Sequence, residues 1–353
     1  MSNRWILTGQ NGYENSLKYE EGVPLPKELG PHEVLVELRA ASLNFRDLVI
    51  ANDENSGAGK IVPNAVPGSD GAGLVKSVGS AVTSFKPGDR VVTHLSPKVV
   101  EAAGDDAHAS FSDISHGMGQ VVDGTLRTAG IFTESALVHA PESLDWAQAA
   151  TLTCSGLTAW NALFGIRGRA VGPGDWVLVQ GTGGVSVAAL QFAVAAGATV
   201  VATTSTEEKA ARLRGLGAKH TINYRTSPDW GAEARKLTPG ARGFDFVVDI
   251  AGNATLAQSL VAVRTDGIVP VVGLAGGEAE PVPMMGALLH ACIVRGLLLG
   301  SRTQFKDMVR FVDEKRVVPA LDDVVFELHE TKEAYRRLQE QKHFSKVVIK
   351  INQ

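Results

Sequence analysis

The chain has 353 residues, of which 44% are hydrophobic and 20% are charged, and its formal net charge is -4. This composition is typical of a globular protein large enough for two domains, and it gives no electrostatic support for nucleic-acid binding. No apolar run is long enough to cross a bilayer, and the N-terminus lacks a signal segment, so we expect a cytoplasmic protein without membrane contacts. Two cysteines, Cys154 and Cys292, provide no disulfide framework.

The first half of the chain is typical of short strands joined by glycine and proline turns. We expect strands at 33–40 and 66–79, a turn followed by a strand within 85–92, and a short helix at 45–50. Strands of this kind predict a compact all-β barrel. The segment from Ser96 to Gly130 has few periodic apolar positions, and we expect it to form a long loop.

The second half alternates strands with helical stretches, which predicts a doubly wound parallel sheet. The expected strands lie at about 175–180, 199–204, 219–222, 244–249, 267–272 and 293–299. A helix at 303–315 is followed by a strand at 324–328, a helix at 330–340 and a strand at 345–351. We expect this tail to return to the first domain. The predicted domains are therefore 1–147 with 301–353, and 148–300.

A glycine turn follows the apolar strand that ends at Gln180. Backbone N–H groups at the start of a helix bind a dinucleotide pyrophosphate where no side chain intervenes. Ser186 stands where the usual fingerprint has its third glycine, and it is small enough for close packing. The alternative is an ordinary turn between a strand and a helix. The candidate cofactor-binding residues of this turn are Gly181, Thr182, Gly183, Gly184 and Val185.

The end of the next strand favours NADPH over NADH. NAD sites usually place an acid about 20 residues past the glycines, and the strand at 199–204 carries none at its tip. Hydroxyl groups and a cation suit a 2′-phosphate, although a lysine at this place is also typical of a solvated helix. The candidates are Thr204, Ser205 and Lys209, with Tyr224 and Arg225 after the following strand.

Several motifs in this order resemble the medium-chain dehydrogenase/reductase superfamily over essentially the whole chain. They are the segments 40–47, 67–73, 85–91, 151–160 and 181–186. The resemblance implies an α/β fold with a GroES-like β-barrel catalytic domain and a Rossmann domain. It also implies an enzyme that transfers hydride to or from a nicotinamide cofactor.

The resemblance also indicates that the catalytic zinc site of the classical alcohol dehydrogenases is not retained. A zinc site of that family needs thiolate and imidazole ligands. The corresponding positions are Asn44, Ser69 and Cys154, with Asp70 in place of a glutamate. We therefore expect no metal and place the chain with the zinc-independent quinone oxidoreductases and enoyl reductases. A rescue of the site by His94, His108 or His116 is the alternative.

Without zinc, an activated C=C bond or a quinone is the easier hydride acceptor, because charge spreads onto a distant oxygen that needs only hydrogen-bond donors. The alternatives are a zinc-free NADP-dependent alcohol dehydrogenase or carbonyl reductase, and a module that binds NADPH without catalysis. We rank Asn44 first as a donor, with a helix cap as its structural alternative. Asp47, as a salt bridge or cap, and Thr158, near the nicotinamide or in the core, complete the candidate catalytic residues.

The family pattern adds cofactor contacts at the ends of two later strands and in the tail. For each of these contacts a purely structural role is the alternative, because glycine turns and exposed cations are common. These residues are Gly273, Leu274, Ser301, Arg302 and Lys346. The apolar segment 291–299 resembles the edge through which family members pair, so we expect a homodimer that acts on a small-molecule substrate. The same segment also suits a strand buried on both faces.

Overall fold

The computed structural model describes residues 1–52, 59–273, 276–277 and 279–352. Contacts divide the chain into two units, residues 1–157 with 301–353 and residues 158–300. The tail therefore belongs with the N-terminal unit. The first boundary follows residue 157, whereas the sequence placed it after residue 147.

The first unit contains two sheets. Its strands are β1 (Ser2–Leu7), β2 (Leu17–Val23), β3 (Glu33–Ser42), β4 (Asp70–Val78), β5 (Arg90–Thr93), β6 (Ala129–Thr133), β7 (Leu137–His139), β14 (Leu321–Glu327) and β15 (Lys346–Lys350). Strands β1 and β2 pair with each other, and the other seven form one sheet in the order β14-β15-β3-β4-β5-β7, with β6 beside β3.

Strand β3 organises this larger sheet. Val34, Val36 and Leu38 alternate with less buried residues and point into one core, as a half-buried strand requires. The start of β3 pairs with β6 and its end pairs with β15. The C-terminal tail thus completes the sheet next to Ser42, where several polar residues of the candidate site gather.

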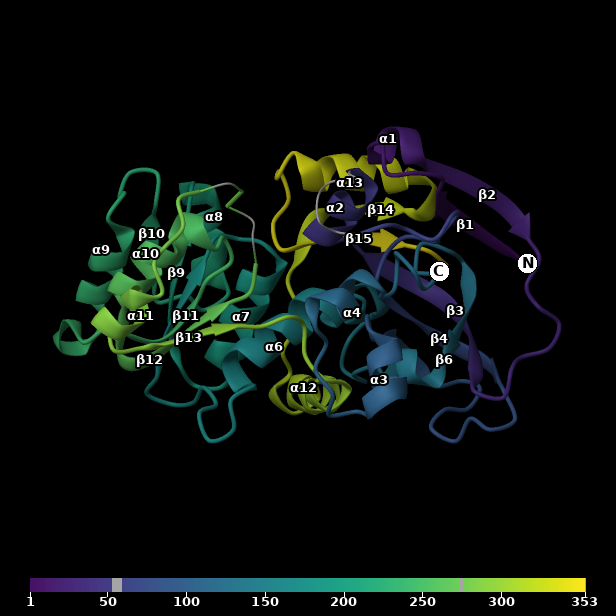
Figure 1. The fold of residues 1–353 in the computed structure, drawn as a ribbon, viewed down its shortest axis with the longest axis horizontal. Helices are drawn as coiled ribbons and strands as arrows, with labels where there is room; N and C mark the ends of the chain where they lie inside the picture. Colours follow the sequence, from purple (N-terminus) through teal and green to yellow (C-terminus); the bar gives the residue numbers. More distant parts are fainter. Residues whose placement is uncertain (53–58, 274–275, 278, 353) are drawn as a thin grey trace. The chain divides into compact units, whose positions relative to one another are not determined.

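The helices of the first unit pack against central as well as edge strands of this sheet. They are α1 (Tyr13–Ser16), α2 (Phe45–Asn52), α3 (Pro97–Ala103), α4 (Phe111–Ser115), α5 (Trp146–Ala149), α12 (Arg302–Lys315) and α13 (Thr331–Gln339), with one-turn segments at Glu134–Ala136 and Leu328–Glu330 and a π-helical turn at Leu152–Gly156. The yellow C-terminal segment that carries α13 lies beside α1 and α2 (Figure 1).

The prediction of a long loop over 96–130 is wrong, because this segment contains α3 and α4 and the start of β6. Residues at the starts of these two helices explain why they form, whereas their apolar residues show no clear helical period. Pro97 occupies the first turn of α3, where its missing N–H costs nothing. Ser110 and Asp113 cap α4 reciprocally, since each side chain accepts from the backbone N–H of the other.

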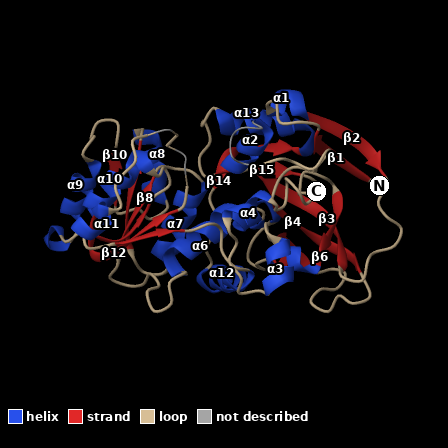
Figure 2. Ribbon diagram, viewed as in Figure 1, coloured by secondary structure: helices blue, strands red, loops and turns tan. Residues whose placement is uncertain are grey.

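The second unit is a parallel sheet with helices on both sides (Figure 2). Its strands are β8 (Trp176–Gln180), β9 (Thr199–Thr204), β10 (His220–Asn223), β11 (Phe244–Val248), β12 (Val263–Val271) and β13 (Ile293–Gly296). Its helices are α6 (Leu157–Phe164, which starts at the boundary), α7 (Gly184–Ala195), α8 (Glu207–Gly215), α9 (Trp230–Leu237), α10 (Asn253–Ala262) and α11 (Met285–Leu289), with a one-turn segment at Pro239–Ala241.

The strand order is β10-β9-β8-β11-β12-β13, and every neighbouring pair is parallel. This is the doubly wound order, in which the chain reverses direction across the sheet between β8 and β11. The predicted doubly wound sheet is confirmed. The last strand is shorter than the expected 293–299, because it stops at Gly296 and Leu299 takes a left-handed backbone conformation with φ of 56°.

In doubly wound sheets, ligands bind at the carboxyl ends of the strands, where the order reverses. The glycine turn after β8 lies at that reversal. No helix in the described part of the chain is both long and apolar enough to cross a membrane.

Candidate functional site

The glycine turn after β8 is shaped by backbone conformation and by open space. Gly181 has a positive φ of 74°, which favours glycine. Gly183 is the residue before α7, and a Cβ built on it would meet no atom within 4 Å. The backbone of the turn is therefore accessible at the N-terminus of a 12-residue helix, which is where an anionic pyrophosphate binds favourably.

Ser186 fills the position of the third glycine with a contact of its own. Its side chain is fully buried, and its hydroxyl donates to the backbone carbonyl of Gln180 over 2.5 Å. This bond ties the first turn of α7 to the last residue of β8. A serine at this position therefore preserves the close packing that the fingerprint requires.

The ends of β9 and β10 bring together three residues that the sequence proposed for the nucleotide. Thr204 ends β9, and its carbonyl accepts from the backbone N–H of Tyr224 over 3.0 Å. The Thr204 hydroxyl is buried and has no partner among the described residues. Ser205 and Tyr224 lie at the same edge and are more exposed. The edge thus offers hydroxyl groups beside the glycine turn.

The start of α8 carries a cation, Lys209, five residues after Thr204 in the chain. Thr206 caps the helix by accepting from the backbone N–H of Lys209 over 3.3 Å, and the Lys209 side chain is half-buried. Glu207 lies in the same turn, but its carboxylate pairs with Arg214 farther along the helix. Because Glu207 is already paired, its charge opposes an anion at the strand end less strongly.

A buried aspartate that the sequence reasoning missed supports the neighbouring loop. Asp249 follows β11 and is fully buried. One carboxylate oxygen accepts from the backbone N–H of Gly252 over 2.9 Å and from the Thr255 hydroxyl over 2.9 Å, and the other accepts from the Ser259 hydroxyl over 2.6 Å. The sequence signal is an aspartate that ends an apolar strand shortly before a glycine, which is typical of an Asx turn.

The loop after β12 packs against this same loop. A Cβ on Gly273 would lie 2.6 Å from the backbone carbonyl oxygen of Ile250, so this close approach requires glycine. Leu274, which the sequence paired with Gly273 as a cofactor contact, lies outside the described residues. The cofactor contact of Gly273 stays a prediction.

A second polar cluster lies in the first unit, around Asn44. The Asn44 side-chain oxygen accepts from the Lys346 ammonium and from the Ser155 hydroxyl, the latter over 3.2 Å. The Lys346 ammonium also lies 3.1 Å from a carboxylate oxygen of Asp70. Both charges of this ion pair are buried. The Asn44 side-chain nitrogen is buried too and has no partner among the described residues.

The hydrogen bonds show which of the two side chains, that of Asn44 or that of Asp47, caps helix α2. The Asn44 side-chain oxygen is held by Ser155 and Lys346, and Asp47 makes the cap, since one of its carboxylate oxygens accepts from the Asn44 backbone N–H over 2.7 Å. Burial raises the pKa of Asp47 to about 6, against the opposing effect of the Arg46 charge. Its other carboxylate oxygen has no partner among the described residues.

The residues at the family's metal positions do not fit a zinc ion. Asn44 and Ser69 replace a thiolate and an imidazole, and the Asp70 carboxylate already pairs with a lysine. Burial raises the pKa of the remaining thiol, Cys154, to about 12, so it stays protonated. No group of three or more histidine, cysteine or acidic residues able to hold a metal occurs in the part of the chain that the structure describes.

Three residues predicted to contact the cofactor make hydrogen bonds or ion pairs within the first unit. Lys346 is buried, and its ammonium contacts Asp70 and Asn44 instead of being presented to a phosphate. Ser301 caps α12. The buried guanidinium of Arg302 donates to the carbonyl of Leu137 over 2.9 Å and pairs with Asp105. The cofactor contacts of these three residues stay predictions, and each polar group already has partners within the first unit.

Thr158 stands at the start of the second unit, in the first turn of α6. Its side chain is buried. Its proposed place near the nicotinamide stays a prediction.

Comparisons with known proteins identify the family of the chain. Residues 30–144 match the family model described as alcohol dehydrogenase GroES-like domain, and residues 184–314 match the one described as zinc-binding dehydrogenase. A zinc-type alcohol dehydrogenase-like protein from Schizosaccharomyces pombe is 39% identical over the full length of both chains. The chain belongs to the medium-chain dehydrogenase/reductase superfamily.

Two further proteins similar to this chain have names that state different reactions. A 2-haloacrylate reductase from a Burkholderia species is 31% identical over 84% of this chain and 79% of its own. The solved quinone oxidoreductase of Pseudomonas syringae is 27% identical, with a TM-score of 0.78 over 99% of this chain and 100% of its own. The protein is an oxidoreductase of a pyridine-nucleotide-dependent family, and the GroES-like and α/β parts of the prediction are confirmed.

Proposed function

We propose that the protein transfers hydride from NADPH to an activated C=C bond or a quinone without the help of a metal ion. The observation that carries this proposal is the buried side-chain nitrogen of Asn44, which has no partner among the described residues. Its amide is fixed through the oxygen by Lys346 and Ser155. A donor held in this way suits an oxygen on which negative charge develops.

The neighbouring lysine strengthens this donor. Contact between the Lys346 ammonium and the Asn44 oxygen polarises the amide, so its N–H groups donate more strongly. The Asp70 carboxylate balances the lysine charge inside the unit. An enolate or a quinol oxygen needs such donors, whereas a simple carbonyl gains more from a Lewis acid.

The second unit supplies the cofactor side of the proposal. The glycine turn at 181–183 and the start of α7 would hold the pyrophosphate, and Thr204, Ser205 and Lys209 would hold the 2′-phosphate of NADPH. When bound, the nicotinamide supplies the hydride. The chain's own residues orient the cofactor and the acceptor and stabilise the oxygen of the acceptor.

A comparison of acceptors tests the reaction class. Purified protein with NADPH is offered an enone, a quinone, a simple aldehyde and, with NADP, a secondary alcohol. We expect NADPH oxidation with the enone or quinone, and an Asn44→Ala variant that loses about 100-fold in kcat. Asn15→Ala, an exposed asparagine in α1, is the matched control. Tight NADPH binding without turnover of any acceptor would instead favour a nucleotide-binding module.

The second candidate is a zinc-free alcohol dehydrogenase or carbonyl reductase. The name of the Schizosaccharomyces relative, a zinc-type alcohol dehydrogenase-like protein, favours the alcohol or carbonyl substrate class but not the absence of zinc. Activity confined to the aldehyde and the secondary alcohol, and unchanged by a chelator, would establish this candidate.

We further propose that the protein acts in the cytoplasm as a homodimer. Strand β13 is an edge of the parallel sheet, and four large apolar side chains are exposed in the helix before it and at the residue that precedes this helix. They are Met284, Met285, Leu288 and Leu289. Apolar side chains grouped beside an open strand edge are typical of a surface that a second subunit covers.

A further inference from the structure

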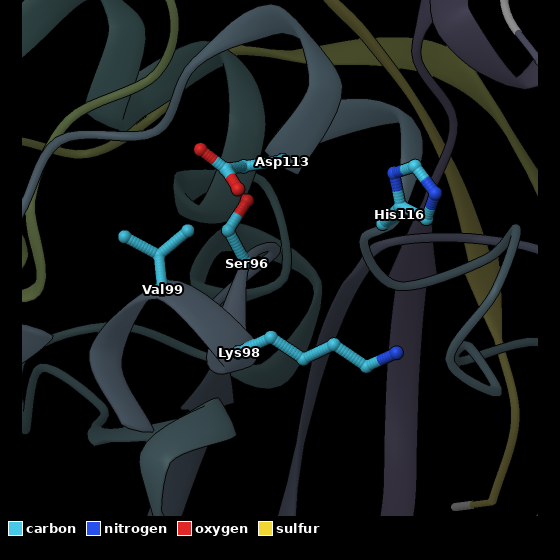
Figure 3. Close-up of a pocket in the computed structure, with 5 residues that line it drawn as sticks. All are labelled: Ser96, Lys98, Val99, Asp113 and His116. Atoms are coloured by element: carbon cyan, nitrogen blue, oxygen red, sulfur yellow. The ribbon is translucent and has the colours of Figure 1, made fainter. Parts of the chain in front are cut away.

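A small pocket in the first unit lies between the start of α3 and α4 (Figure 3). Its volume is about 220 Å³, and Lys98 and Asp113 in its lining carry opposite charges. Charges of both signs favour neither an anion nor a cation, so the pocket assigns no class of ligand. A buried amide in the second unit, the side chain of Gln180, indicates a role in nucleotide binding instead.

Gln180 is the last residue of β8, directly before the glycine turn, and it is only 3% exposed. Its side-chain nitrogen donates to the Ser259 hydroxyl over 2.7 Å, and its side-chain oxygen accepts from the Ile250 N–H over 3.4 Å. Its backbone carbonyl accepts from the hydroxyl of Ser186 in the first turn of α7. One residue therefore joins the start of α7, the loop after β11 and helix α10.

The hydrogen bonds fix which way the Gln180 amide faces. The Ser259 hydroxyl donates to a carboxylate oxygen of Asp249 over 2.6 Å, so it accepts from the Gln180 nitrogen. The backbone N–H of Ile250 can only donate, so the amide oxygen must face it. Both ends of the amide are thus specified. Neither a hydrocarbon nor a carboxylate of the same length could make both bonds.

Ile250 is the residue through which this amide reaches the nucleotide-binding turn. A Cβ built on Gly181 would lie 3.9 Å from the end of the Ile250 side chain, so this side chain borders the glycine turn. The Ile250 carbonyl lies against Gly273 in the loop after β12. The position of Ile250 therefore affects two loops that the sequence assigns to the cofactor.

The Gln180 side chain extends the link between β8 and β11 past the end of their pairing. The two strands lie side by side in the parallel sheet (Figure 1), and their register ends with Val179 opposite Val248. Gln180 is the next residue of β8, and the Ile250 N–H bonds to its side chain instead of its backbone. The amide thus holds the first residues of the loop where backbone pairing has ended.

We propose that Gln180 is a positioning residue that holds the loop 250–252 against the glycine turn and thereby sets the affinity of the second unit for a pyridine nucleotide. It acts through Ile250 and Ser186 and does not itself touch the nucleotide. The inference rests on the proposed cofactor site at the glycine turn and is independent of the hydride acceptor. NADPH and NADH share the pyrophosphate that the turn would bind, so both should depend on Gln180 equally.

Nucleotide titration of the native chain and of a Gln180→Met variant tests the inference without any acceptor. Methionine has a side chain of similar length but makes neither hydrogen bond of the amide. We expect the Kd for NADPH and the Kd for NADH each to rise by about tenfold, as the loss of about one net hydrogen bond would give.

A Gln180→Glu variant adds a readout that a general loss of stability would not give. The Gln180 nitrogen lies 3.5 Å from a carboxylate oxygen of Asp249, so the new carboxylate would lie beside that group. Two adjacent carboxylates raise the pKa of one of them, and a proton shared by the pair restores a donor towards Ser259. The Kd for NADH of this variant, divided by that of the native chain, should therefore fall as the pH is lowered from about 8 to about 5. The same ratio for Gln180→Met should not change with pH.

Val177→Ala is the matched control. Val177 is fully buried in β8, near the opposite end of the strand from Gln180, so its truncation lowers stability without removing the amide. We expect this variant to bind both nucleotides with the native Kd. Denaturant unfolding measures the stability of each variant, so that affinities are compared at similar losses of stability.

The outcomes separate this inference from the proposed function. Native affinity in Gln180→Met, equal weakening in Val177→Ala, or a Gln180→Glu ratio that does not change with pH overturns the inference. A native chain that binds neither nucleotide overturns the proposed cofactor site and the inference with it. Binding that depends on Gln180 in a protein that reduces no acceptor supports the inference and overturns the proposed reaction. If Gln180→Met does not fold, the pH dependence of Gln180→Glu decides.

Discussion

Asp47 carries a buried carboxyl group whose ionisation is opposed by its surroundings. Its pKa is about 6 in the folded chain, above the usual value of 3.8. A raised carboxyl pKa means that the folded state holds the proton more tightly than the unfolded state does. The contribution of Asp47 to stability is therefore greatest below pH 4 and declines as the pH rises to 6.

The variant Asp47→Asn removes this titration while keeping an oxygen that accepts from the Asn44 N–H. The free energy of unfolding of the variant minus that of the native chain should increase by about 2 to 3 kcal/mol as the pH rises from 4 to 6. Denaturant unfolding at several pH values measures the difference. A difference between the two proteins that does not change with pH would show that Asp47 is not the titrating group.

Lys209 tests the assignment of the nucleotide. A cation near the Thr204 hydroxyl favours a 2′-phosphate and adds little to a 2′-hydroxyl. Lys209→Ala should therefore weaken NADPH binding by about tenfold and leave NADH binding nearly unchanged. Fluorescence titration with both nucleotides measures this, with Lys236→Ala on α9 as the control. Equal weakening of both nucleotides would remove the cofactor assignment.

At the scale of elements, the loop after β11 depends on one carboxylate. Asp249 accepts from two backbone N–H groups and from the Thr255 and Ser259 hydroxyls, so its removal leaves several buried donors unpaired. Asp249→Ala should lower the free energy of unfolding by about 3 kcal/mol or more. Thermal and denaturant unfolding measure the loss, with Asp307→Ala, a partly exposed aspartate in α12, as the control. Unchanged stability would contradict this role.

The parallel sheet could be predicted from the sequence because residues that favour strands locally are also the apolar residues that the core of the sheet buries. Strand β8 is buried throughout, and its apolar run followed by glycines has few alternative explanations. The helices α3 and α4 were not predicted, because they are short and depend on capping residues more than on an apolar face.

Residues of the candidate site could be predicted only where the backbone conformation requires a particular residue type. The glycines of the turn after β8 are needed by geometry, so their pattern is visible in the sequence. The partners of Lys346 lie more than 270 residues earlier, at Asn44 and Asp70. No local pattern indicates that a lysine of the tail is buried against them, which is why it was expected to meet a phosphate.

For the whole molecule, the exposed apolar residues of α11 predict association of two chains. Leu289 is 79% exposed and Met284 is 80% exposed, beside the edge strand β13. Leu289→Asp should convert the dimer into a monomer. The thermal midpoint of unfolding of each unit should change little, because this side chain contributes little to the core of a single chain. Analytical ultracentrifugation over a range of concentrations measures the mass. A native chain that is monomeric at every concentration would contradict the dimer.

We propose that hydride passes from NADPH to the carbon of an activated C=C bond with no metal ion. The most direct measurement uses NADPH deuterated at the transferred position, an enone, and protein shown by elemental analysis to contain no stoichiometric zinc. We predict a saturated ketone that carries deuterium at the β-carbon. Deuterium on the carbonyl carbon of an allylic alcohol would rule out transfer to the C=C bond, and turnover that begins only when zinc is added would rule out metal-free transfer.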